Sequence, residues 1–282
     1  MTMLLTLCAG SLRSHLSKGA HPEKSTDGMP GNGRAPRMTM LDVPQFVVKT
    51  LRLHGLNIPA SLLAKWSLED LDRLRDRADK AACPCLVLLE DTPLSLADAD
   101  ESRAEAAVQR VHRLAVAANR LGCNSIALCI DAPDTADAFE LAADQIRDLL
   151  PSVERLELNV LLSQHEGLTA STERLTSLIK RIGGFRIGSL PSFGSAASAG
   201  KGDPIEGLRK LAPYAGAIHA TIEGFTKKGT HKSWDLQACV NAIRSVGFLN
   251  TLAIDYTGEG DPVPNIEKAR DLLQAAIDAE EA

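Results

Sequence analysis

One unit recurs along this sequence: a short, mostly apolar run followed by a longer segment with apolar residues every three or four positions. A continuous apolar run is typical of a strand that is covered on both faces, and the longer pattern is typical of a helix that buries one face. The unit is therefore a strand joined to a helix, as in parallel α/β sheets. It occurs eight times, which predicts an α/β protein with a single (β/α)8 TIM-barrel domain over residues 1–282.

The boundaries of these elements follow from the ends of each pattern. The expected strands are 3–10, 56–58, 85–90, 125–131, 156–162, 185–190, 217–225 and 252–256. The expected helices are 42–54, 67–78, 101–121, 137–150, 171–182, 203–214, 234–246 and 265–279. Asp42 and Ser67 are expected to cap their helices, Ser67 in a capping box with Asp70. Pro151 is expected to end the helix before it.

Segment 11–36 interrupts the pattern. It is rich in Gly, Pro, Ser and Lys and shows no periodicity, so we expect a long surface loop or a disordered insertion after the first strand. The apolar run before it is very short and no Lys or Arg precedes it. We therefore interpret that run as a buried strand and not as a secretion signal.

Charge and composition narrow the classes of partner. The chain has 31 basic and 36 acidic residues, a net charge of -5, and no basic stripe interleaved with aromatic residues. A nucleic-acid partner is therefore not expected, nor is a membrane partner. The six cysteines lie mostly in apolar patterns, which favours buried thiols in a reducing cytoplasm over a disulfide framework. Cys83 and Cys85 lack a second pair at zinc-ligand spacing, which favours core thiols there.

Titratable residues lie near the ends of the last two expected strands. His219 and Glu223 lie within 217–225, and Asp255 lies in 252–256. In parallel barrels the catalytic groups are found at the carboxyl ends of the strands. His219 can therefore be a general acid or base, or alternatively a strand histidine that is only hydrogen-bonded. For Asp255 we favour a role in the site over a capping role.

Five short motifs follow one another in the second half of the chain. They are Gly167-Leu-Thr-Ala-Ser171 after the fifth strand, Leu190-Pro-Ser-Phe-Gly194 after the sixth, Leu211-Ala-Pro-Tyr-Ala215 before the seventh, Ile218-His219 within it, and Ala253-Ile-Asp-Tyr-Thr-Gly258 at the eighth. In this order they resemble the xylose isomerase-like TIM barrels, from about Leu41 to the C-terminus. That family includes sugar-phosphate isomerases and epimerases and, more distantly, metal-dependent apurinic endonucleases.

The resemblance also implies a site. Family members typically hold one divalent metal with a Glu, an Asp, a His and a Glu at the ends of strands five to eight, and the two Glu residues transfer protons. The matching positions here are Ser163, Ser192, His219 and Asp255. Neutral hydroxyls are poor ligands for Mn²⁺ or Mg²⁺, so we expect no metal cofactor, or at most a weakly bound divalent metal. Ser163 and Ser192 are then candidates for substrate binding, and His165, which also matches a family position, is a candidate catalytic residue.

The expected loop after the seventh strand contains Lys227 and Lys228. Loops after strands seven and eight of TIM barrels often bind phosphate, so these lysines are candidates for substrate binding. A solvated loop is the alternative interpretation.

Two functions of different class remain open. The first is a sugar phosphate isomerase or epimerase relative that acts on a small sugar or sugar phosphate by proton transfer, with His219, Asp255, His165 and Glu223 as catalytic candidates and a reduced metal site. The second is an inactive pseudoenzyme that keeps the barrel mouth as a carbohydrate-binding or regulatory surface. The fold alone does not choose between them. The resemblance also allows a homo-oligomer.

Overall fold

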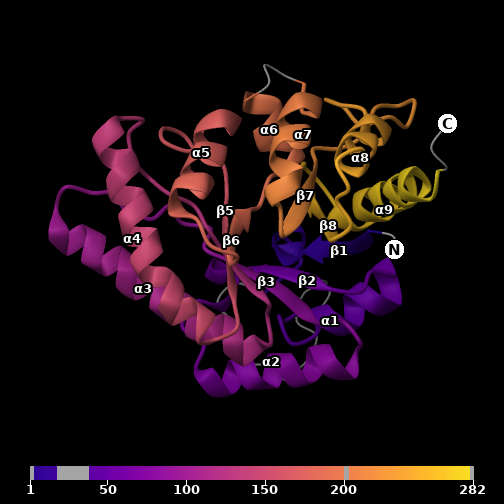
Figure 1. Ribbon diagram of the computed structural model, residues 1–282. Helices are drawn as coiled ribbons and strands as arrows, with labels where there is room; N and C mark the ends of the chain where they lie inside the picture. Colours follow the sequence, from indigo (N-terminus) through magenta and orange to yellow (C-terminus); the bar gives the residue numbers. More distant parts are fainter. Residues whose placement is uncertain (1–2, 18–37, 200–202, 280–282) are drawn as a thin grey trace.

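A computed structural model describes residues 3–17, 38–199 and 203–279. Within them, eight strands form one parallel sheet in the order β6-β5-β4-β3-β2-β1-β8-β7, and Figure 1 shows β1 beside β8. The strands are β1 Leu4–Cys8, β2 Leu56–Pro59, β3 Cys85–Leu89, β4 Ser125–Leu128, β5 Asn159–Leu162, β6 Ile187–Ser189, β7 Ala217–Ile222 and β8 Thr251–Tyr256. The expected fold, a single (β/α)8 TIM barrel, is confirmed.

The barrel closes between β6 and β7 through isolated pairings. Ser189 pairs with Ala215 and Ser192 pairs with His219, both in parallel. The backbone N–H of His219 donates to the carbonyl oxygen of Pro191 at 2.9 Å, just beyond the end of β6. The seam that closes the barrel therefore runs through the backbone of His219.

The helices cover the outside of the sheet (Figure 1). They are α1 Val43–Phe46, α2 Leu68–Lys80, α3 Glu101–Leu121, α4 Ala136–Glu154, α5 Thr172–Ile182, α6 Phe193–Ala199, α7 Ile205–Leu211, α8 Leu236–Arg244 and α9 Pro262–Asp278. A π-helical turn, Val47–Leu51, extends α1. Short 3-10 helices lie at Ala9–Leu12, Ala60–Leu63 and Ala212–Tyr214. None of the helices in the described ranges is long and apolar enough to cross a membrane.

Side chains alternate between the two faces of each strand. In β7, Ile218, Ala220 and Ile222 pack in the large core between the sheet and the helices. Ala217 belongs instead to a small apolar cluster that fills part of the barrel interior. The other members of that cluster are Val87, Ala127, Leu161 and Leu190. By the same alternation, His219 and Thr221 point into the barrel, because they lie two and four residues after Ala217.

Two expectations about helix ends were wrong. Pro151 does not end its helix, because α4 continues to Glu154 and buries Val153 completely against the core. Asp42 precedes α1, but its carboxylate accepts from the backbone N–H and the hydroxyl of Thr39 and not from the helix. The capping box of Ser67 and Asp70 is confirmed. Burial of Val153 favours continuation of α4 past Pro151, and Thr39 takes the carboxylate of Asp42 that would otherwise cap α1.

The first residues of segment 11–36 belong to the packed structure. Ser11 and Leu12 are buried in the 3-10 helix Ala9–Leu12, and the Ser11 hydroxyl accepts from the backbone N–H of Tyr256 at 2.8 Å. This contact links the end of β1 to β8. Leu16 then pairs with Met38. Most of the expected insertion, residues 18–36, lies outside the described residues.

The loops after β4 and β5 meet at a glycine. Gly167 has φ +78°, and a Cβ at this position would lie 2.2 Å from the carbonyl oxygen of Ala132.

Gly247 has the same φ as Gly167, but no described heavy atom lies within 4 Å of its Cβ position. We expect Gly247→Ala to lower the free energy of unfolding by about 1–2 kcal/mol, the left-handed backbone penalty. Gly167→Ala should lower it by at least about 1 kcal/mol more, because the new methyl overlaps a carbonyl. Urea unfolding of both variants measures the difference, and equal losses would contradict the close contact.

Candidate functional site

Polar side chains fill one half of the barrel interior. The strands that carry them are neighbours in the sheet, since β7, β8, β1 and β2 are adjacent. The residues are Thr6 and Cys8 of β1, Asn57 of β2, His219 and Thr221 of β7, and Asp255 of β8. Thr6, Cys8, Asn57, His219 and Thr221 are buried and Asp255 is half-buried. The other half of the interior is the apolar cluster around Leu161.

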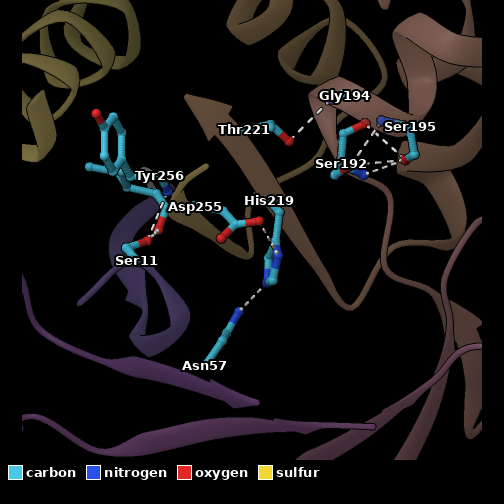
Figure 2. Close-up of polar contacts among 10 residues, drawn as sticks. Ser11, Asn57, Ser192, Gly194, Ser195, His219, Thr221, Asp255 and Tyr256 are labelled. Atoms are coloured by element: carbon cyan, nitrogen blue, oxygen red, sulfur yellow. Dashed lines mark hydrogen bonds and ion pairs between the residues drawn. The ribbon is translucent and has the colours of Figure 1, made fainter. Parts of the chain in front are cut away.

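His219 lies at the centre of this polar group and is 6% exposed. Its Nδ1 lies 3.7 Å from Oδ2 of Asp255, and its Nε2 lies 3.1 Å from Nδ2 of Asn57 (Figure 2). An amide nitrogen can only donate, so with this amide orientation Nε2 of His219 accepts. Nδ1 then carries a proton and faces the carboxylate of Asp255.

Asp255 is held in its charged form by its neighbours. Burial by itself raises the pKa of the carboxyl, but the hydrogen bonds of His219 and Cys8 outweigh burial, so the pKa of Asp255 is below its usual value. Burial, and then the charge of Asp255, raises the pKa of the Cys8 thiol well above its usual value. The thiol is therefore a neutral donor at neutral pH. The side chain of Asp255 is 24% exposed, so solvent reaches part of it.

Ser192 is engaged in local structure. Its hydroxyl lies 2.9 Å from Oγ of Ser195 and accepts from the backbone N–H of Ser195 at 3.0 Å, a contact that holds the first turn of α6. Ser195 in turn donates to Oε1 of Gln164 at 3.0 Å. Ser163 is half-buried, and its backbone N–H donates to the carbonyl oxygen of Leu128 at 2.9 Å.

These two serines decide whether the family metal fits. At the four matching positions the structure offers two neutral hydroxyls, one imidazole and one carboxylate. Mn²⁺ and Mg²⁺ need several charged or carbonyl oxygens, and the hydroxyl of Ser192 is already used by Ser195. The donor set therefore does not fit a tightly held hard divalent cation.

His165 lies beside a neighbouring cavity. The cavity has a volume of about 470 Å³ and is lined by Gln164, His165, Glu166, Ala170, Ser171, Ser195, Ser198 and Ala199. The backbone N–H of His165 donates to Oγ1 of Thr169 at 3.0 Å. The hydrogen bond between Gln164 and Ser195 connects this cavity to Ser192.

Glu223 follows β7 and makes its contacts within its own loop. Its carboxylate accepts from the hydroxyl of Ser233, and its side chain is exposed. Lys227 and Lys228 are also exposed. Lys228 borders a cavity of about 680 Å³ between this loop and α9, which contributes Leu272 and Ala275. His219 and Asp255 thus lie together inside the barrel, whereas the side chain of Glu223 contacts Ser233 of its own loop.

His231 anchors that loop. It is 7% exposed, and its ring stacks on Trp234 with centroids 4.6 Å apart. The backbone N–H of Glu223 points at Nε2 at 3.1 Å, and the backbone N–H groups of Ser233 and Trp234 point at Nδ1 at 3.2 and 3.3 Å. A neutral ring has one acceptor nitrogen, so it accepts on one of these two sides. A ring protonated on both nitrogens could accept from none of them. Burial lowers the pKa of His231, and the charge of Lys232 adds to this effect.

Sequence reasoning missed Cys8, Asn57 and the anchoring role of His231. A signal for the first two exists, because each is a polar or thiol side chain one residue away from apolar positions in a buried strand. Alternation alone would have placed both inside the barrel. That they meet His219 depends on closure of the sheet.

The stability of the protein should depend on pH through His231. An unfolded histidine has a pKa of about 6.5, and the folded pKa of His231 is lower. At a pH between these two pKa values, residue 231 is protonated in the unfolded chain and neutral in the folded chain. The free energy of unfolding therefore falls as pH falls below about 6.5. His231→Gln keeps an acceptor and removes the titration. Urea unfolding at a series of pH values should show a wild-type advantage that shrinks towards acid pH. A difference between the two proteins that stays constant across the series would refute this role.

Comparisons with known proteins agree with this architecture. The sequence profile of the family described as xylose isomerase-like TIM barrel matches residues 50–276. No curated protein matches the sequence. Among solved structures, a 3-keto-D-glucoside 4-epimerase from E. coli is similar with a TM-score of 0.72 and 13% identity, over 97% of this chain and 99% of that one.

Two further structures are similar. An L-ribulose 3-epimerase has a TM-score of 0.68 and 15% identity, over 80% of this chain and 84% of that one. The IOLI protein, described with a binding zinc atom, has a TM-score of 0.72 and 12% identity, over 98% of each chain. At these identities the structures show the fold alone. Because the family profile covers most of the sequence, this chain belongs to the xylose isomerase-like TIM barrel family.

Proposed function

We propose that this protein is an isomerase or epimerase that moves a proton on a small sugar or sugar phosphate bound at the barrel mouth. The observation that carries the proposal is the pair formed by His219 and Asp255 at 3.7 Å, in which the carboxylate is ionised and partly open to solvent. Similar folds that are described as sugar epimerases support the substrate class.

Asp255 is the base in this proposal. An ionised carboxylate can remove the proton from a carbon next to a carbonyl group, as isomerisation and epimerisation both require. A sugar that displaces water from the mouth desolvates Asp255 further, and desolvation raises its pKa and therefore its basicity. His219 lies beside the base, with Nδ1 facing the carboxylate, and orients it, while Asn57 holds the other ring nitrogen at 3.1 Å.

Other side chains at the mouth have supporting roles in the proposal. An epimerase needs a second group to return the proton on the opposite face, and His165 and Glu223 are the candidates. Ser163 and Ser192 would contact substrate hydroxyls, and Lys227 or Lys228 would contact a phosphate. The reaction would proceed without a tightly bound Mn²⁺ or Mg²⁺, since the four matching positions supply one carboxylate. Six free thiols support a reducing cytoplasm as the location.

A specific observation favours a second candidate, a carbohydrate-binding protein without catalysis. The two positions that carry acids in family members carry Ser163 and Ser192 here, and Ser192 holds the start of α6. A mouth that retains hydroxyls and lacks those acids can still bind a sugar.

Exchange of solvent deuterium into candidate ketoses and their phosphates, followed by NMR, separates the two candidates. We expect the wild type to exchange the proton next to the carbonyl of at least one sugar in the panel. Asp255→Asn should lower that rate by at least about 100-fold, the usual contribution of a general base. The matched control is Asp148→Asn, on the exposed outer face of α4.

Each result has a defined meaning. Unchanged exchange in Asp255→Asn would remove Asp255 as the base. A wild type that binds a sugar in saturation-transfer NMR but exchanges no proton on any of the panel would replace the enzyme with the binding protein.

A further inference from the structure

We propose that Cys8, His219 and Asp255 form a binding site for Zn²⁺. The three side chains come from β1, β7 and β8, and their candidate ligand atoms all lie within 4.8 Å of one another. The set differs from the four family positions, because a thiol from the first strand takes the place of the ligands from strands five and six. The inference goes beyond the proposed function, since binding of the ion does not depend on sugar chemistry.

The geometry is close to that of a tetrahedral site. With Zn–S near 2.3 Å and Zn–N and Zn–O near 2.0–2.2 Å, neighbouring ligand atoms lie about 3.3–3.8 Å apart. Nδ1 of His219 and Oδ2 of Asp255 already lie 3.7 Å apart. The span of 4.8 Å within the group needs to contract by at most about 1.5 Å. Rotation of side chains at the ends of rigid strands is enough for that change.

The chemistry of the three donors selects the ion. One sulfur, one imidazole nitrogen and one carboxylate oxygen form a mixed set that suits Zn²⁺, whereas Mg²⁺ and Mn²⁺ prefer oxygen ligands. Binding converts the Cys8 thiol to a thiolate and releases its proton to solvent, so the charge of the site stays balanced by two anionic ligands against a divalent ion. Three protein ligands leave a fourth position open to water or a small molecule.

Asn57 supports the site from behind His219. A histidine that binds a metal through Nδ1 carries its proton on Nε2 and needs an acceptor there. Asn57 is completely buried, and its Oδ1 has no hydrogen-bond partner among the described residues. Turned by 180°, the amide presents this oxygen to Nε2–H of His219 in place of Nδ2. One side chain can therefore serve both the metal-free and the metal-bound histidine.

Zinc binding would weaken Asp255 as a base. A carboxylate that donates electrons to Zn²⁺ has a lower affinity for a proton, so Zn²⁺ should slow the exchange reaction. This consequence, unlike the site itself, rests on the proposed function.

The test uses the full chain, freed of metal by a chelator and titrated with Zn²⁺ and with Co²⁺. We expect one equivalent of Zn²⁺ per chain by elemental analysis, and a near-ultraviolet thiolate-to-cobalt charge-transfer band with Co²⁺. Asn57→Ala should weaken Zn²⁺ binding about 10–100-fold, as loss of an outer-shell partner does. Cys8→Ser should weaken it by more than that and abolish the band. The matched control Cys129→Ser, at a half-buried thiol after β4, should keep both.

Two results would overturn the site: a wild type that shows no charge-transfer band, or a band that persists in Cys8→Ser. The wild-type spectrum needs no variant, so the outcome does not depend on whether Cys8→Ser folds. Zinc bound as expected, together with no exchange on any sugar by the metal-free protein, would reject the proposed function and leave the site intact. Exchange without zinc binding would reject the site and leave the proposed function intact.

Discussion

The two-residue period of the strands is the constraint on which the rest of this structure depends. In a closed parallel barrel every strand must give one face to the helices and the other to the interior. Here the outward positions of β7, Ile218, Ala220 and Ile222, are apolar and lie in the main core. The inward positions of four neighbouring strands instead carry several polar side chains, among them His219 and Asp255. A single slip in register would place these groups against the helices.

Burying so many polar atoms opposes stability unless they find partners. An unpartnered buried donor or acceptor costs roughly 1–3 kcal/mol. Both ring nitrogens of His219 are matched, one by Asn57 and one by Asp255. Among the described residues, Oγ1 of Thr6 and Oδ1 of Asn57 have no partner. An apolar interior would avoid this cost. A buried polar group inside the barrel is therefore typical of a site kept for binding or chemistry.

The loop after β7 is held in place by one buried histidine. The backbone N–H groups of Glu223, Ser233 and Trp234 all point at the buried ring of His231, which accepts through one of its two nitrogens. Phe225 packs edge-on against the same ring. This loop therefore leaves β7 in a fixed direction, and the orientation of Glu223 is set by Ser233 and not by His219. A histidine that looks unremarkable in the sequence thus organises the loop, because its importance lies in backbone contacts.

The sequence by itself determined the number of strands, their parallel arrangement and most helix bounds, because hydrophobic period and capping residues are local properties. It also pointed to His219 and Asp255, since both are titratable residues in the last two strands. It did not reveal that Cys8 and Asn57 complete the group, and it expected Pro151 to end a helix that tertiary packing of Val153 extends. Only closure of the sheet sets β1 between β2 and β8 and so brings residue 8 to residue 255. Local periodicity fixes the face on which a side chain lies, but the partners on that face are chosen by strand pairings that join distant parts of the chain.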